Sequence, residues 1–191
     1  MNKLTECVTL WLIRNEVIGK EEQELYQYAV ESIVLTLVPF ALTICLGLVM
    51  GANIACVALI LPFMIIRSYS GGFHASKISH CFIMSCLLLT MAIRISQRIQ
   101  FSPEFVVIVM IAAVCVCIFS PVISENKPLD DTEIRKNKKY TSVIALFFLA
   151  VSILLGVAGL QLLAVYIGVG IMIVPIMQLP CIISGLKRRY E

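Results

Sequence analysis

Long apolar runs dominate this chain, and short polar segments separate them. Residues 33–66 hold no charged side chain over 34 positions, whereas one transmembrane helix needs about 20 residues. Gly51 and Asn53 favour a turn near the middle of this run. The pattern therefore predicts two helices here, at about 33–50 and 53–66.

Four more apolar runs follow, and each predicts a further span, at about 81–93, 105–123, 141–158 and 162–183. The first of the four is short for a full crossing, so it needs part of the preceding polar segment or a locally thinned bilayer. Polar and glycine residues predict a loop at 94–103 and a turn at 159–161. Pro175 and Pro180 predict a break or kink in the last span.

The N-terminal segment, residues 1–31, has an amphipathic pattern. Its apolar stripe consists of Leu4, Cys7, Val8, Trp11 and Leu12, which have the spacing of one helical face. Such a helix can lie in the membrane interface or pack on the rest of the protein in the cytosol, and both interpretations stay open. Glutamates interrupt the segment, unlike a secretory signal peptide, so we expect it to remain on the mature protein.

Composition changes the picture from apolar helices to a membrane protein. Of the 191 residues, 60% are apolar and 14% charged, against about 45–50% and about 25% in soluble domains. We therefore predict an all-α polytopic integral membrane protein with about six short transmembrane helices and an N-terminal amphipathic interfacial helix. The N-terminal segment 1–31 would precede a single membrane domain, residues 32–191.

The distribution of positive charge predicts the orientation of the chain. Lysine and arginine favour the cytoplasmic side of a membrane. With six spans and both termini cytoplasmic, all but Arg94 and Arg98 of the fifteen Lys and Arg residues lie inside. This arrangement predicts a multi-pass protein of the cell membrane whose polar segment 67–80 faces the cytoplasm.

That polar segment, extended to Cys81, is the candidate active site. It contains the only two histidines of the chain, His74 and His80. Ionisable groups at membrane depth are costly and are functional candidates for that reason. A cysteine nucleophile needs a base, or a cation that favours its thiolate. Either histidine could be the base, and Arg67 and Lys77 would favour the thiolate.

Geometry separates the two histidines. On one straight helix the Cα atoms of His74 and Cys81 would lie about 10.5 Å apart along the axis, and His74 would point away from Cys81. Since proton transfer needs contact at about 3 Å, His74 requires a break in the helix, which Gly71 and Gly72 permit. A second helix that begins near Cys81 would stabilise the thiolate. His80 would face about 100° away from Cys81 on a helix, so we favour His74.

Three other interpretations of this segment stay open. Both histidines could be interfacial caps, with Cys81 a packing residue. A metal site made by His74, His80, Cys81 and Cys86 would match no standard zinc spacing, and we expect neither a metal nor a cofactor. A serine nucleophile would lack the Gly-x-Ser-x-Gly elbow.

Arg67, Gly72, His74 and Cys81 match, in order and spacing, the Arg-x4-Gly-x-His-x6-Cys pattern of the AgrB family, which this chain resembles. Members are membrane cysteine endopeptidases that process autoinducing-peptide precursors in Gram-positive bacteria. The similarity continues at Pro121, at residues 126–129 and in the basic run 135–140. Chain length and the six-span pattern agree over nearly the whole chain, whereas residues 76–80 depart from the family.

The resemblance implies a substrate and a reaction. The substrate would be a short precursor peptide with an amphipathic leader and an acidic C-terminal tail. Cys81 would attack the peptide bond before the tail, and His74 would act as base and then protonate the leaving amine. A cysteine or serine within the peptide would attack the Cys81 thioester and release a thiolactone or lactone ring.

A basic stripe offers a place for the acidic tail. Asp130 and Glu133 have capping-box spacing, which predicts a helix start there. On this helix Arg135, Lys138 and Lys139 fall on one face. The stripe could bind the tail of the peptide, or it could serve only orientation and attraction to anionic lipids, worth about 1 kcal/mol per residue.

A non-catalytic membrane protein, either a transporter subunit or a peptide sensor, is the alternative function. A transporter would be expected to carry ionisable residues in its spans, and a sensor would not need His74 and Cys81 together. The expected partners are the peptide and membrane lipids, without nucleic acid. The Gly47/Gly51 pair permits close helix approach and is a candidate homodimer face.

Overall fold

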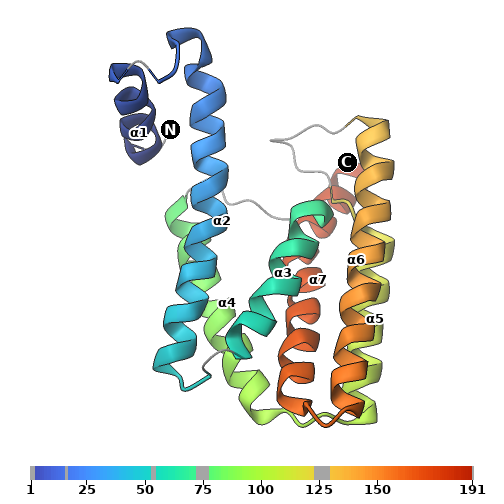
Figure 1. Ribbon diagram of the computed structural model, residues 1–191. Coiled ribbons are helices and arrows are strands. Elements are labelled where there is room, and N and C mark those ends of the chain that lie inside the picture. Colours follow the sequence, from blue (N-terminus) through green and yellow to red (C-terminus); the bar gives the residue numbers. More distant parts are fainter. Residues whose placement is uncertain (1–2, 16, 53–54, 72–77, 123–129, 191) are drawn as a thin grey trace. The chain divides into compact units, whose positions relative to one another are not determined.

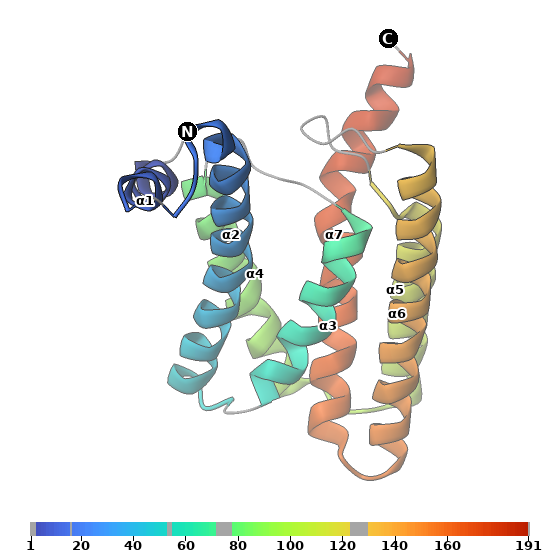
Figure 2. The same cartoon turned by 45° about the horizontal axis from the view of Figure 1, so that its top comes forward.

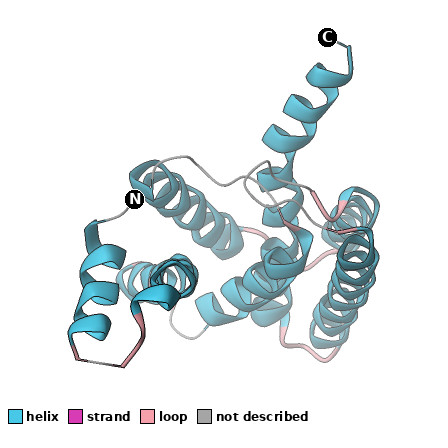
Figure 3. Cartoon of the chain, turned by 90° about the horizontal axis from the view of Figure 1, so that it is seen from above, coloured by secondary structure: helices cyan, strands magenta, loops and turns pink. Residues whose placement is uncertain are grey.

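The computed structural model describes residues 3–15, 17–52, 55–71, 78–122 and 130–190. Over these ranges the chain forms seven α-helices and one 3-10 helix and no strand (Figure 3). The all-helical prediction is confirmed for this part of the chain. It divides into two compact units, Met1–Leu42 and Thr43–Glu191, while the predicted boundary after residue 31 stays a prediction.

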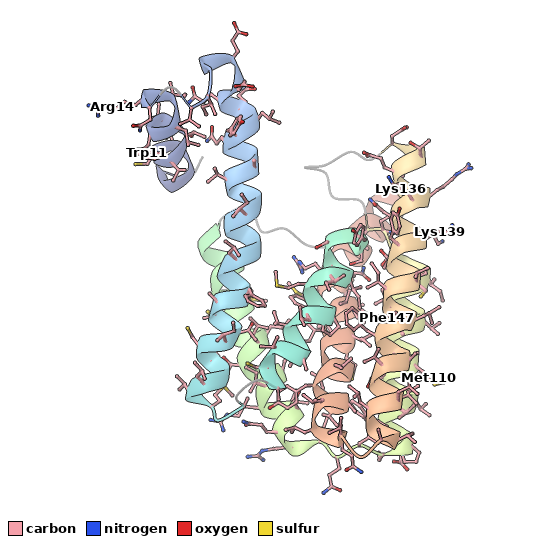
Figure 4. All side chains as sticks on the ribbon, in the orientation of Figure 1. Trp11, Arg14, Met110, Lys136, Lys139 and Phe147 are labelled. Atoms are coloured by element: carbon pink, nitrogen blue, oxygen red, sulfur yellow. The ribbon has the colours of Figure 1, made fainter. Side chains whose placement is uncertain are left out.

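The first unit contains α1 (Lys3–Arg14), the 3-10 helix η1 (Lys20–Glu22) and most of α2 (Gln23–Val49). Asn15 follows the last residue of α1, and its backbone N–H and its Nδ2 both donate to the Trp11 carbonyl oxygen, at 3.1 and 2.8 Å. Trp11 is 60% exposed and is labelled on α1 in Figure 4. The predicted N-terminal helix is present, and its position in the membrane interface stays a prediction.

In the second unit α7 (Gln161–Tyr190) is the central helix. It contacts α3 (Ala55–Ser70), α4 (Ile78–Arg98), α5 (Pro103–Phe119) and α6 (Asp131–Val157), as Figures 1 and 2 show. Every residue of 164–171 on α7 is buried, as expected for a helix that is apolar on all sides. A Cβ atom added at Gly170 would meet the Leu59 carbonyl oxygen, so this glycine allows α3 and α7 to approach closely.

Helix α6 buries small side chains and exposes large ones. The buried positions of α6 are Thr141, Ala145, Ser152 and Gly156, all with small side chains, and Ser152 Oγ donates to the Ala164 carbonyl oxygen of α7 at 2.8 Å. None of its large apolar residues is buried, and several, such as Phe147 (labelled in Figure 4), are exposed. Small residues at helix contacts and large apolar residues outside are typical of helices packed within lipid.

Two glycines end helices by the same hydrogen-bond pattern. At the end of α2, Gly51 has φ +70°, and the N–H groups of Gly51 and Ala52 donate to the carbonyl oxygens of Leu48 and Gly47. Gly159, with φ +87°, ends α6 in the same way. Both are Schellman caps, and they confirm the turns predicted at these positions.

Several helix bounds differ from the sequence prediction. The loop predicted from residue 94 is wrong in its first part, because α4 continues to Arg98; a cation in the last turn is favourable there. Of the break or kink predicted near Pro175 and Pro180, the break is wrong, since α7 is one helix through both, and the kink stays a prediction. Membrane-type helices tolerate proline where neighbours satisfy the freed carbonyl groups.

The predicted start of α6 is confirmed. The helix begins at Asp131, and the backbone N–H of Asp130 donates to Glu133 Oε2 at 3.4 Å. Two segments of the described structure, Thr132–Val157 and Gln161–Leu179, are long and apolar enough to cross a membrane, and three apolar helices are shorter. The six-span arrangement stays a prediction.

Candidate active site

The structure describes only part of the predicted site. Gly72 and His74 lie outside the described residues, and for Cys81 only the backbone is described, in the first turn of α4. Arg67 and Gly71 are described in full, at the end of α3. The described residues of the site thus lie at the end of α3 and at the start of α4.

Arg67 lies in the last turn of α3 and joins this helix to α7. Its Nη1 donates to Met177 Sδ at 2.8 Å, and its Cζ lies 5.8 Å from the centre of the Phe63 ring, within the range of a cation–π contact. A cation is also favourable at a helix C-terminus. These contacts hold the guanidinium charge next to the point where α3 ends.

Gly71 provides the break that the geometry of a His74–Cys81 pair requires. Its φ is +68°, a left-handed conformation that favours glycine. It forms a parallel bridge with Val122, and an added Cβ would meet the Val122 carbonyl oxygen. A side chain at position 71 would therefore push the chain away from Val122 at the point where α3 ends.

The ends of α3 and α5 are tied together by a set of polar contacts, here called the α3–α5 junction. It comprises Ser70 and Gly71 after α3, Ser120 to Val122 after α5, and Gln178 of α7. The Ser70 carbonyl oxygen accepts from the Val122 N–H at 2.9 Å and from Gln178 Nε2 at 3.4 Å. The Ser120–Pro121 peptide bond is cis.

Gln178 is the centre of this junction. The residue is 1% exposed, and its Nε2 also donates to Ser120 Oγ at 3.0 Å. Both amide hydrogens are therefore used, and this fixes which end of the amide is nitrogen. Its Oε1 is buried and has no hydrogen-bond partner in the described structure, as is also true of Thr141 Oγ1 on α6.

The basic stripe is present on the first turns of α6. Arg135, Lys138 and Lys139 are exposed, and Lys139 is labelled in Figure 4. The next residue, Tyr140, packs against Tyr69 of α3, with ring centres 5.5 Å apart and ring planes tilted by 49°. The stripe is thus joined directly to the last turn of α3, two residues before Gly71.

Sequence reasoning missed the junction and its central residue. Gln178 is a polar side chain within the apolar run 162–183, and a polar residue at membrane depth is a functional candidate. That signal was present. Its partners Ser70 and Ser120 lie 108 and 58 residues away, and no local pattern predicts such contacts.

No group of three or more His, Cys, Asp or Glu residues among those described could hold a metal ion. The described residues instead place a polar junction at one end of apolar helices. The apolar segments Thr132–Val157 and Gln161–Leu179, together with the small buried and large exposed side chains of α6, favour the class of helical membrane proteins.

Comparison with known proteins gives the family. The family model of Accessory gene regulator B (AgrB) matches residues 5–181. An AgrB-like protein of Listeria monocytogenes serovar 1/2a is 30% identical over 178 residues, which cover 90% of this chain and 85% of that protein. No solved structure matches the chain.

Two further relatives agree. AgrB-like protein 2 of Clostridium perfringens is 31% identical over 149 residues, or 71% of this chain and 69% of that protein. The accessory gene regulator protein B of Staphylococcus carnosus is 30% identical over 84 residues, 44% of each chain. The chain belongs to the AgrB family, as its motif predicted, and this membership is consistent with a role in quorum sensing.

Proposed function

We propose that this chain is a membrane-embedded cysteine endopeptidase that cleaves the C-terminal tail from a quorum-sensing precursor peptide. Family membership supports the proposal. The observation that carries it is the break at Gly71, which is fixed to Val122, followed by a helix whose first turn contains Cys81. The N-terminus of a helix favours a thiolate.

The proposed reaction proceeds by two acyl transfers. The Cys81 thiolate attacks the carbonyl carbon of the bond before the tail, the C–N bond breaks, and His74 gives its proton to the leaving amine. A cysteine thiol or serine hydroxyl within the peptide then attacks the thioester. Its proton passes to His74, the bond to Cys81 breaks, and a thiolactone or lactone is released.

The acidic tail of the peptide would bind the basic stripe of α6. Arg135, Lys138 and Lys139 are exposed on the first turns of this helix. The contact between Tyr69 and Tyr140 joins that part of α6 to α3. A tail bound on the stripe would therefore lie near the end of the helix that precedes the catalytic segment.

The proposed enzyme is a multi-pass protein of the cell membrane with six spans. Both termini, residues 67–80 and the stripe lie on the cytoplasmic side, as the distribution of Lys and Arg favours. A homodimer is part of the proposal, but Gly47 is buried and Gly51 lies past the end of α2, so the dimer face is not assigned to this pair. The reaction needs no cofactor.

The first test measures the reactivity of Cys81 without any substrate. Iodoacetamide alkylation of Cys81 is followed against pH by peptide mass spectrometry, in detergent, for the unaltered protein and for His74→Ala. We expect Cys81 to react at a pH well below its reference pKa of about 8.5. His74→Ala should restore slow labelling that rises only near that reference pKa.

Cys86 serves as an internal control in the same experiment. It lies five residues after Cys81 on α4 and is half-buried. Because it is not a member of the proposed pair, its labelling should not depend on His74. If Cys81 labels as slowly as Cys86 in both variants, the endopeptidase proposal fails. A non-catalytic peptide sensor or transporter subunit would then be favoured.

A further inference from the structure

Gln178 is a buried polar residue that the proposed reaction does not use. It lies on α7, in an apolar region of the second unit, and is 1% exposed. Its amide nitrogen donates to two residues that are far apart in the sequence, Ser70 at the end of α3 and Ser120 directly after α5. One side chain thus contacts both helix ends of the α3–α5 junction.

The junction precedes the segment that carries the proposed base. Ser70 is followed by Gly71, where the chain turns away from α3 with φ +68°, and His74 is three residues further along the sequence. Val122, the bridge partner of Gly71, is two residues after Ser120. Gln178 therefore contacts the chain at the last residue of α3, four positions before His74.

Packing alone does not explain a glutamine at this position. Its Oε1 is buried and has no partner in the described structure, and a buried acceptor without a donor costs free energy. An apolar side chain of the same length, such as methionine, would avoid that cost and fill the same volume. What a glutamine supplies here, and a methionine would not, is the pair of hydrogen bonds to Ser70 and Ser120.

We propose that Gln178 is a positioning residue of the endopeptidase, which sets the place of His74 relative to Cys81 by fixing Ser70 and Ser120. This inference rests on the function proposed above. Gln178 acts on the geometry of the chain and transfers no proton itself. Misplacing a catalytic group by about 1 Å costs up to about a hundredfold in rate, so the effect is measurable.

The test uses the alkylation rate of Cys81 by iodoacetamide in the detergent-purified protein. Gln178→Met keeps the length of the side chain and removes its hydrogen bonds. We expect it to slow Cys81 labelling at pH 7 by at least about tenfold and to move the pH curve toward that of His74→Ala. Thermal melting of each variant is measured in the same detergent.

Gln97→Met is the matched control. Gln97 is also a glutamine whose Nε2 donates to a distant backbone carbonyl, that of Met50, at 2.7 Å. It lies on α4, sixteen residues after Cys81, or about 24 Å along the helix axis. Its replacement should leave the labelling curve of Cys81 unchanged.

A double variant separates positioning from a general loss of structure. If Gln178 acts through His74, then Gln178→Met combined with His74→Ala should label Cys81 no more slowly than His74→Ala alone. If the double variant is again about tenfold slower, Gln178 acts independently of His74 and the inference is overturned.

Gln178→Glu tests the hydrogen bonds of the residue. A protonated carboxyl can donate one hydrogen bond, whereas a carboxylate donates none, and burial favours the protonated form. Where the carboxyl ionises within the tested range, the labelling rate of this variant, divided by that of the unaltered protein, should therefore rise as the pH falls. The melting temperature is measured at each pH, and a ratio that only follows the melting temperature contradicts the inference.

The remaining outcomes are also decisive. Should Gln178→Met fail to fold, Ser120→Ala and Ser120→Thr replace it, because only threonine keeps the hydroxyl that accepts from Gln178; equal labelling of the two overturns the inference. If folded Gln178→Met labels like the unaltered protein while His74→Ala is slow, this inference alone fails. If His74→Ala has no effect, the proposed function fails and takes this inference with it.

Discussion

At the residue scale, the left-handed glycine at position 71 has two separate reasons to be glycine. Its φ of +68° disfavours any other residue, and an added Cβ would meet the carbonyl oxygen of Val122. Gly51 has nearly the same φ, +70°, but nothing lies within 4 Å of an added Cβ there. The two glycines share a backbone conformation, but an added side chain would meet a neighbour only at position 71.

Alanine at these two positions should therefore have different effects. Gly51→Ala should cost about 1–2 kcal/mol, the penalty for a side chain in the left-handed region. Gly71→Ala should cost more, because Val122 must also move, and it should slow the alkylation of Cys81. Detergent thermal melting and the labelling rate give the two readouts. Equal losses of stability for the two variants would contradict a close approach of Gly71 to Val122.

At the element scale, the sequence predicted where helices occur better than where they end. Each of the six apolar runs contains a helix, because periodicity and missing charge are local signals. The caps at Gly51, Gly159 and Asp130 were also predicted, since each depends on residues within a few positions. The extension of α4 to Arg98 was missed, because a charge was taken as the end of a helix when it can stabilise the last turn.

The contents of the site were predictable to a lesser degree. The motif identified Arg67, and the break required before His74 pointed to Gly71. The structure supplies their contacts with Met177 and Val122. The pairing of His74 with Cys81 stays a prediction. The role of Gln178 could not be predicted, because its partners are brought to it only by the packing of α3, α5 and α7.

The first turns of α6 carry a prediction about substrate binding. Replacing Arg135, Lys138 and Lys139 together by glutamate should raise the KM for the precursor peptide, since an acidic tail would then meet like charges. The kcat should change less, because these residues lie outside the reacting atoms. Kinetics with a precursor-type peptide that carries an acidic C-terminal tail provide the measurement. An unchanged KM, with topology intact, would remove the stripe from substrate binding.

At the scale of the whole molecule, the exposed surface of the outer helices is the main feature. Large apolar residues such as Met110 on α5 and Phe147 on α6 are exposed (Figure 4), while small residues are buried on α6. Extended exposed apolar surface marks contact with lipid or another protein. Combined with the family match over residues 5–181, this surface supports a membrane location.

The proposed orientation can be tested on intact cells. In a variant without its natural cysteines, Lys136→Cys should resist a membrane-impermeant maleimide, because the start of α6 is placed on the cytoplasmic side. Gln100→Cys, in the segment between α4 and α5, should be labelled from outside. Labelling of Lys136→Cys before the cells are opened would rule out the six-span arrangement with both termini inside.

Trp11 is the only tryptophan of the chain, and it lies on α1 with 60% of its surface exposed. Indole fluorescence of the entire protein therefore originates from a single position on the N-terminal helix. In vesicles, emission at short wavelength with quenching by brominated lipid chains would place that helix at the lipid boundary. Emission at long wavelength with quenching by iodide would place it in water. The molecule thus carries its own optical reporter for the segment whose location the sequence left open.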